Sequence, residues 1–303
     1  MFKNIVIIPT EGFANRLRAI ASTSCLSNFL NIPFFVIWEK EKCCNIEIHQ
    51  IFNTPFDTID LNHILNSKYY FSPNLHTNNY LSSLTRSDTE YDFLIIKGGH
   101  EFKHDDMDEQ IFLYKKHQFY HSLQFTSFIQ DYIQQFSLPN NVIGIHFRDF
   151  VRDYDHADAR IFSSDSPLSL FNSILKNMLT KNPNQLFYLS TNTSDAKQFF
   201  INNVPSKNII HYDHNNFQRN DHNGVLNAVI DFVLLSKTKY ILGSYMSSFS
   251  DEAAFFNFIP KCCIRNHNHN DHSIKYHCYG SSVHHDNVYL LYKKNLHNDI
   301  FVT

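Results

Sequence analysis

Short apolar runs alternate with helix-length segments along most of the chain. Residues 4–9 are a short β-branched run, residues 10–13 have the composition of a turn, and residues 14–30 follow a long helical pattern. This order of strand, turn and helix predicts the first βα unit of a Rossmann-like fold. Residues 34–38 and 93–97 are the next predicted strands, whereas residues 39–92 are polar and irregular and give no clear assignment.

The pattern becomes regular from residue 141 onward. The predicted strands there are residues 142–147, 186–189, 209–211 and 240–243. Helix-length segments separate them; one is predicted to start at Pro167 after an N-cap at Ser166, and another after an N-cap at Ser194. Strands and helices that alternate in this way predict a parallel sheet in an α/β fold.

The chain is long enough for two domains of ordinary size, since it has 303 residues. The linker is expected near residues 137–140, which gives domains at 1–138 and 139–303. Apolar residues make up 43% of the sequence and are spread along it, so each domain can bury a core without disulfides or a structural metal.

The charge pattern argues against several classes of partner. The net charge is −3 with acidic and basic residues interleaved, so no basic stripe is available for a nucleic acid backbone. The first apolar run is too short for a signal peptide or a membrane span, and we expect no transmembrane segment and a cytoplasmic location.

Cysteine and histidine usage gives no metal site. The adjacent pairs Cys43-Cys44 and Cys262-Cys263 fit neither a regular disulfide framework nor a C-x-x-C knuckle. Residues 266–272 are expected to be a histidine-rich loop, and irregular spacing argues against zinc there and in the rest of the tail. The residues weighed for zinc are His267, His269, His272, His277, Cys278, His284 and His285.

One predicted strand has a histidine and an arginine at its carboxyl end. His146 and Arg148 are two residues apart and therefore point to the same face, at the edge where parallel sheets bind ligands. The planar guanidinium could hold a diphosphate and neutralise it as a leaving group. The alternative is a structural ion pair of Arg148 with Asp149 or Asp153.

A nearly continuous apolar helix, 229–236, carries one carboxylate, Asp231, with Asn227 one turn earlier. This acid could accept hydrogen bonds from a guanine edge or a ribose. The alternative is that both residues form the solvent side of the helix.

The segment 243–254 is predicted to be a strand end, a serine-rich turn and a helix start. Free amides and hydroxyls at such a helix terminus bind phosphate, here expected on a loop at 247–249. The alternative is that Ser248 or Ser250 serves only as the N-cap. All three motifs follow successive strands of one sheet, so they are expected to converge on one edge.

The same residues resemble a known family, the GT-B fucosyltransferases that include α1,6- and α1,2-type enzymes and protein O-fucosyltransferases. The matching segments are His146-Phe-Arg148, Asp231-Phe-Val-Leu-Leu-Ser236, Ser247-Ser-Phe-Ser250, Gly12-Phe-Ala-Asn-Arg16 and Leu189-Ser-Thr-Asn192. Ala14, Asn192 and Asp149 depart from the family pattern, which has a glycine, an acid and, in the α1,6 enzymes, a second arginine there. These departures bear on the donor and the linkage more than on the fold.

The resemblance implies two Rossmann-like domains facing a central cleft and an inverting, metal-independent transfer from GDP-fucose to a glycan or protein hydroxyl. Arg148 would bind the diphosphate, Asp231 the guanine, and Ser248 and Phe249 the phosphates, while Asn15 would face the sugar. No cofactor is implied beyond the GDP-sugar donor. The expected donor-binding residues are Asn15, Arg16, His146, Arg148, Asp231, Ser247, Ser248 and Phe249.

An inverting transfer also needs a base for the acceptor hydroxyl. Asp153 and Asp155 are candidates, on a long polar segment, 150–166, that is either an acceptor-side lid or a plain loop. Two rival hypotheses remain: a transferase that uses another nucleotide sugar, such as GDP-mannose or a UDP-sugar, and a nucleotide-sugar-binding protein without catalysis.

Overall fold

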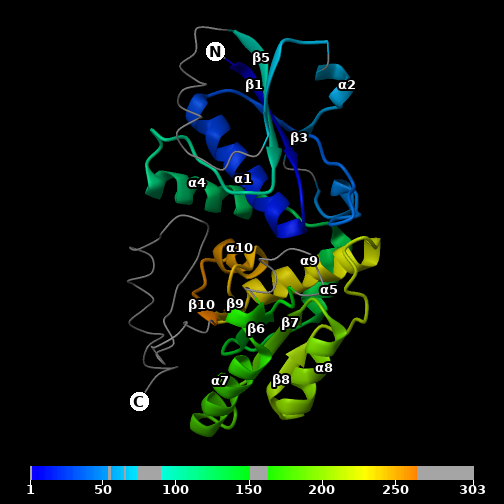
Figure 1. Ribbon diagram of the computed structural model, residues 1–303, viewed down its shortest axis with the longest axis vertical. Helices are drawn as coiled ribbons and strands as arrows, with labels where there is room; N and C mark the ends of the chain where they lie inside the picture. The colour runs from blue at the N-terminus through cyan, green and yellow to red at the C-terminus, as the bar shows by residue number, and fades with distance from the viewer. Residues whose placement is uncertain (1, 54–55, 65, 74–89, 151–162, 265–303) are drawn as a thin grey trace. The chain divides into compact units, whose positions relative to one another are not determined.

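The computed structural model describes residues 2–53, 56–64, 66–73, 90–150 and 163–264. These residues form two compact units, each with a parallel five-stranded sheet and helices packed against it (Figure 1). Unit 1 extends to Tyr132 and includes Gln218–Val229; unit 2 comprises Ile133–Phe217 and the chain from Ile230 on. The predicted α/β fold is thereby confirmed, whereas the domain limits of 1–138 and 139–303 stay a prediction.

Unit 1 is built around its first strand. The strands are β1 (Phe2–Pro9), β2 (Phe34–Val36), β3 (Asp57–Thr58), β4 (Tyr69–Pro73) and β5 (Tyr91–Gly98), in the order β3-β2-β1-β5-β4. The helices are α1 (Phe13–Leu30), α2 (Leu61–Ile64) and α4 (Glu109–Ser122), with a 3₁₀ turn at Ile48–Gln50; α5 (Ser127–Gln135) begins in unit 1 and ends in unit 2. The three strands predicted here are present, and β3 and β4 lie in the stretch that the pattern left unassigned.

Unit 2 repeats this plan with β6 at its centre. The strands are β6 (Ile143–Phe147), β7 (Phe187–Thr191), β8 (Ile209–His211), β9 (Ile241–Ser244) and β10 (Lys261–Ile264), in the order β10-β9-β6-β7-β8. The helices are α7 (Leu168–Lys181), α8 (Ser194–Asn203) and α10 (Ser248–Phe256), with a 3₁₀ turn at Ser206–Asn208; α9 (His222–Ser236) begins in unit 1 and ends in unit 2. The four predicted strands are confirmed, and β10 was not predicted.

Two helix starts differ from the predictions. The N-cap of α7 is Pro167 rather than Ser166, and the Ser166 hydroxyl instead donates to the carbonyl of Ile264 (2.6 Å). The N-cap of α8 is Thr193 rather than Ser194, because the Thr193 hydroxyl accepts from the Ala196 amide. In both helices the observed cap is the residue adjacent to the predicted one.

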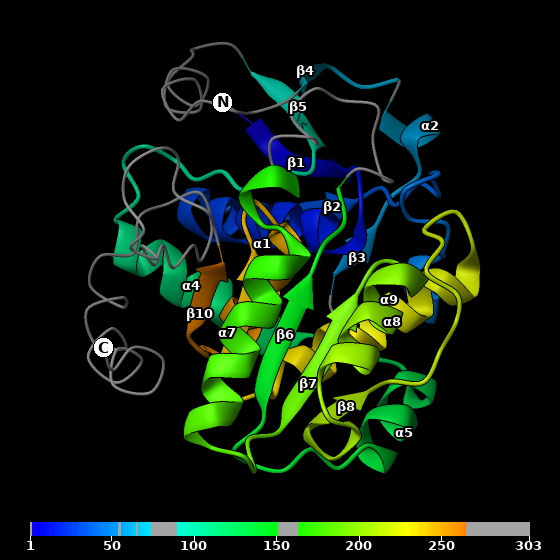
Figure 2. The ribbon, with the colours of Figure 1, turned by 60° about the horizontal axis from the view of Figure 1, so that its bottom comes forward.

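The side chains along β6 alternate between the two faces of the second sheet; Figure 2 shows the ribbon of this sheet with its helices. Ile143, Ile145 and Phe147 belong to a core cluster that includes apolar residues of α7 and α8. Gly144 faces the other way, where a Cβ atom would lie 2.7 Å from the Leu235 side chain of α9. His146 points to this second face too, since side chains alternate along a strand.

The order of strands defines where this sheet can bind a ligand. The chain runs from β6 to β7 and β8 on one side, then to β9 and β10 on the other. Ligands of open α/β sheets bind at the carboxyl ends of the strands where the order reverses. That point lies between the ends of β6 and β9, which carry His146, Arg148 and the serine-rich turn. Among the described residues, no helix is both long enough and apolar enough to cross a membrane.

Candidate functional site

The residues that follow β6 are hydrogen-bonded to the ends of its two neighbouring strands, β9 and β7. The backbone N–H of Arg148 donates to the Ser244 hydroxyl at the end of β9 (3.0 Å). The next residue, Asp149, is hydrogen-bonded through its backbone to Asn192, which follows β7. The Arg148 guanidinium lies over the Phe150 ring, 4.9 Å from its centre. The structure therefore holds the backbone under Arg148 at the reversal point of the sheet.

His146 is a buried, uncharged part of the same edge. Its ring stacks on Phe249 of α10, with 4.9 Å between ring centres and 21° between planes. The Ser247 hydroxyl lies 3.4 Å from its Nδ1 atom. Burial, followed by the charges of Lys261 and Arg148, lowers the pKa of His146 well below its usual 6.5. His146 is thus neutral at pH 7, and positive charge at the strand end comes from Arg148.

The serine-rich segment begins α10 directly and is not a loop. Ser247 is the N-cap, so the alternative in which Ser248 or Ser250 serves only as the N-cap is wrong. Ser248 and Phe249 form the first turn, preceded by Met246 in the left-handed conformation at φ 55°. The turn that leads into α10 therefore lies immediately before Ser247, and the predicted phosphate-binding residues are at a helix N-terminus.

A buried ion pair compensates the acidic residue in the first turn of α10. Lys261, on β10, bonds to the Asp251 carboxylate, and both residues are less than 10% exposed. Gly243 leaves room for it, because a Cβ atom there would lie 2.7 Å from Lys261 Cε. An unpaired carboxylate in the first turn would repel an anion, and this pair reduces that repulsion. The sequence analysis missed Lys261, since β10 was not predicted.

Asp231 is buried and does not lie on a polar face of its helix, which corrects the alternative that places it on the solvent side. Only 4% of the residue is exposed. The Tyr188 hydroxyl donates to Oδ1, and His214 Nε2 lies 3.3 Å from Oδ2. Burial and then the Asp231 charge raise the pKa of Tyr188 well above 10, so its hydroxyl stays protonated and remains a donor. Contact of Asp231 with a guanine stays a prediction.

Unit 1 holds the other two predicted donor-binding residues, Asn15 and Arg16, in the first turns of α1. Arg16 is fully buried and donates to the carbonyls of Glu11 (2.8 Å) and Glu39 (2.7 Å). Its remaining nitrogen pairs with the Glu41 carboxylate at 2.9 Å. These bonds give Arg16 a positioning role within the unit, and its contact with a donor stays a prediction.

Glu11 is a candidate that the sequence analysis missed. It follows β1 in the left-handed conformation, with φ 67°, which is uncommon for a residue with a side chain and is concentrated at functional sites. Asn15 donates to its carboxylate, and His100 Nε2 lies 3.8 Å from the other oxygen. Gly99 permits this packing, because a Cβ atom there would lie 2.8 Å from the Thr10 carbonyl. Unit 1 thus has the half-exposed carboxylate of Glu11, a residue with a strained backbone, near the carboxyl ends of β1 and β5.

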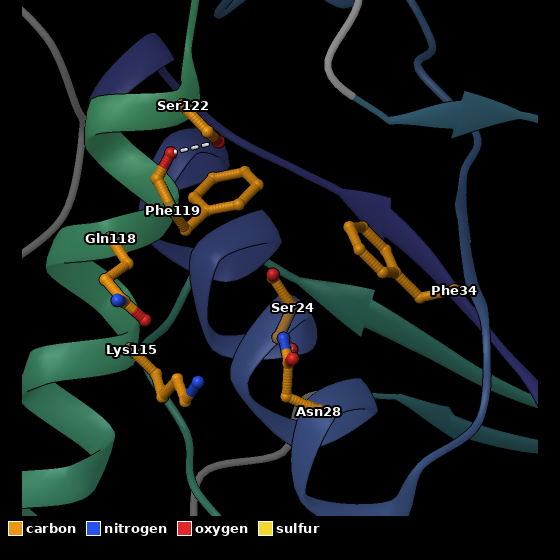
Figure 3. Close-up of a pocket in the computed structure, with 7 residues that line it drawn as sticks. All are labelled: Ser24, Asn28, Phe34, Lys115, Gln118, Phe119 and Ser122. Atoms are coloured by element: carbon orange, nitrogen blue, oxygen red, sulfur yellow. Dashed lines mark hydrogen bonds between the residues drawn. The ribbon is translucent and has the colours of Figure 1, made fainter.

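A separate polar pocket lies between α1, β2 and α4, away from that edge (Figure 3). Its lining residues are Ser24, Asn28, Phe34, Lys115, Gln118, Phe119 and Ser122. Ser24 and Asn28 lie in the second half of α1, more than two helical turns beyond Asn15. The pocket is therefore distinct from the predicted site residues of unit 1.

The described residues contain no group of three or more histidine, cysteine, aspartate or glutamate side chains that could hold a metal ion. The two candidate bases, Asp153 and Asp155, lie outside the described residues, as do the histidine-rich loop at 266–272 and the other tail residues weighed for zinc.

The fold is similar to that of known fucosyltransferases. NodZ α-1,6-fucosyltransferase soaked with GDP-fucose aligns with a TM-score of 0.59 and 13% identity, over 86% of this chain and 94% of that one. A mutant of FUT1 from Arabidopsis thaliana in complex with GDP aligns with a TM-score of 0.59 and 15% identity, over 88% of this chain and 71% of that one. POFUT1 in complex with GDP aligns with a TM-score of 0.53 and 10% identity, over 86% of this chain and 98% of that one.

These likenesses support the predicted GT-B type of fold. At the level of sequence, no protein-family model matches the chain and no curated protein gives a significant match.

Proposed function

We propose that this chain is an inverting, metal-independent glycosyltransferase that moves fucose from GDP-fucose to a hydroxyl of a glycan or protein. The observation that carries the proposal is that Arg148 follows β6 and the N-terminus of α10 follows β9, at the reversal point of the unit 2 sheet. One arginine and one helix N-terminus at a single edge are suited to a diphosphate. The fold likeness to proteins with bound GDP or GDP-fucose supports the same assignment.

The chemistry follows from the charge that builds up when the sugar leaves. As the bond between the sugar carbon and the diphosphate oxygen breaks, negative charge accumulates on the nucleoside diphosphate. The guanidinium of Arg148, whose backbone is held by a hydrogen bond to Ser244, stabilises that charge without a large rearrangement of the site. Neutral His146 stacks on Phe249 in the first turn of α10 and contributes no charge of its own, so the guanidinium of Arg148 carries this role.

The acceptor hydroxyl must lose its proton to a base. Asp153 and Asp155 remain candidates for that base, and Glu11 joins them because its carboxylate ends a parallel strand and is oriented by Asn15. Glu11→Gln is expected to abolish transfer while nucleotide binding to unit 2 remains. Transfer by Glu11→Gln at the wild-type rate would leave Asp153 and Asp155 as the candidates.

A transferase that uses another nucleotide sugar is the second candidate. For a donor without guanine, such as a UDP-sugar, it is favoured by the contacts of Asp231, since one carboxylate oxygen accepts from Tyr188 and the other faces His214. An acid occupied in this way has less capacity left for a guanine edge. A donor panel of GDP-fucose, GDP-mannose and UDP-sugars separates the two candidates.

The decisive experiment measures release of the nucleoside diphosphate with donor and acceptor present, for wild type, Arg148→Lys and Arg148→Ala. Arg148→Lys should still bind nucleotide but lose turnover by about 10²-fold or more, because an ammonium cannot replace the guanidinium fork. Arg148→Ala should also bind donor poorly. Near wild-type turnover by Arg148→Lys would exclude the leaving-group role, and binding of donor without any release would identify a protein that binds but does not catalyse.

A further inference from the structure

Two histidines face each other at the carboxyl-terminal end of α4, in unit 1. His117 and His121 are one helical turn apart, so their side chains lie on the same face. Their Nε2 atoms are 2.8 Å apart, and the rings are nearly perpendicular, with 4.1 Å between centres and 73° between planes. The two imidazoles thus present their outer nitrogens to one point beside the helix.

The distance between the nitrogens is that of two ligands in a chelate. Metal–imidazole bonds are about 2.0–2.1 Å long, so two nitrogens at 90° around one metal lie about 2.8–3.0 Å apart. A tetrahedral angle would require about 3.3–3.4 Å. The observed 2.8 Å matches two adjacent positions of a square-planar or octahedral ion.

We propose that His117 and His121 bind a divalent transition metal that prefers such geometry, Cu²⁺ or Ni²⁺, with water completing the coordination. Imidazole suits both ions, and the binding series places Cu²⁺ above Ni²⁺ and Zn²⁺. Gln118 and Ser122 of the same helix line the polar pocket of Figure 3. The proposed metal site shares no residue with the proposed donor site.

The protonation of the pair agrees with this assignment. Burial, and then the neighbouring His121 ring, lower the pKa of His117 to about 4, so this ring is neutral at pH 7. Without metal, one Nε2–H donates to the other Nε2. When a metal binds, both Nε2 lone pairs coordinate it, and the shared proton moves to Nδ1 of the ring that carried it.

The test is a calorimetric titration of the full chain with Cu²⁺, Ni²⁺ and Zn²⁺ at pH 7. Four proteins are compared: wild type, His117→Gln, His121→Gln and the double variant. The histidine-rich tail is the same in all four, so its contribution cancels in the comparison. His49→Gln, which removes an exposed histidine of the 3₁₀ turn, is the matched control and should bind like wild type.

Chelation predicts that either single substitution weakens one Ni²⁺ site by about tenfold or more and that the double variant is little worse than the singles. Two independent histidines would instead give small losses that add. Additive losses, or equal Ni²⁺ binding by all four proteins, would overturn the proposal. Tighter binding of Zn²⁺ than of Ni²⁺ at this site would overturn the geometric argument.

Discussion

Asn192 binds the backbone of Asp149 with both ends of its carboxamide. Its Oδ1 atom accepts from the Asp149 N–H at 2.8 Å, and its Nδ2 atom donates to the Asp149 carbonyl at 3.0 Å. This pair joins the end of β7 to the end of β6, one residue after Arg148. A carboxylate could accept the first bond but could not donate the second. The departure of Asn192 from the acid of the fucosyltransferase pattern therefore has a structural role in this chain.

Asn192→Asp tests that role. The substitution loses a hydrogen bond and sets a negative charge against a carbonyl oxygen, so we expect stability to fall by about 1–3 kcal/mol. Turnover should fall as well, because Asp149 directly follows Arg148. Urea unfolding and nucleoside diphosphate release measure the two effects. Asn203→Asp is the control, since its amide donates to a backbone carbonyl at an exposed helix end. Equal effects of both substitutions would contradict a special role for Asn192.

Asp231→Ala tests a buried network, and we expect it to affect the fold first. The substitution leaves the Tyr188 hydroxyl without its acceptor and removes the carboxylate that faces His214, at a cost of about 1–3 kcal/mol. Asp213→Ala is the control, because Asp213 is 89% exposed and its ion pair with Lys197 should contribute little. Unchanged unfolding together with lost nucleotide binding would show that Asp231 acts mainly on the ligand.

The contrast between Asp231 and Arg148 shows what the sequence could and could not predict. Strand alternation places Arg148 on a definite face and at a definite edge, because a strand has two faces and one carboxyl end. Helix α9 is apolar nearly all round, so its pattern gives no polar face on which to place Asp231. The burial of Asp231 depends on Tyr188 and His214, which come from other parts of unit 2.

Arg16 and Lys261 show a second limit. The motif around Arg16 is visible in the sequence, but its three partners at Glu11, Glu39 and Glu41 come together only through the packing of α1. Lys261 lies on a strand of four residues with a charged first position, which the apolar pattern does not reveal. The position of these residues near the strand ends was therefore predictable from topology, whereas their charge partners were not.

His146 should contribute to acid sensitivity. Its pKa is lowered in the folded state, whereas in the unfolded chain it is near 6.5, so the unfolded state binds a proton that the folded state does not. Stability is therefore lost as pH falls below about 6.5, by up to about 1.4 kcal/mol per pH unit. His146→Gln should have a shallower loss between pH 6.5 and 5, measured by urea unfolding at each pH. An unchanged slope would show that His146 takes up its proton over the same pH range in the folded and the unfolded state.

Excess EDTA should leave the proposed transfer intact. Arg148 and the α10 N-terminus supply the positive potential that a metal would otherwise provide to the diphosphate. The same chelator should remove any Cu²⁺ or Ni²⁺ held by His117 and His121, so the two events are separable in one sample. Release of nucleoside diphosphate is measured before and after chelation. Loss of turnover with EDTA and its return with Mn²⁺ or Mg²⁺ would contradict metal-independent transfer.

Lys261 and Asp251 offer the sharpest test of the proposed phosphate-binding turn. Lys261→Met leaves the buried Asp251 carboxylate without its cation, and breaking a buried pair from one side costs about 3–5 kcal/mol. The negative charge of Asp251, which Lys261 no longer offsets, lies in the first turn of α10, so nucleotide binding should weaken as well.

The double variant Lys261→Met, Asp251→Asn separates lost charge from lost packing. With both charges removed, much of the stability should return, because replacing a whole buried pair is often near neutral. Nucleoside diphosphate binding should recover with it, since no carboxylate is left at Asp251 to oppose the phosphates. Calorimetric titration with GDP and urea unfolding on the three proteins measure both quantities. If Lys261→Met unfolds more easily yet binds GDP as tightly as wild type, the phosphates do not sit at the N-terminus of α10, and the pair serves only the packing of β10 against that helix.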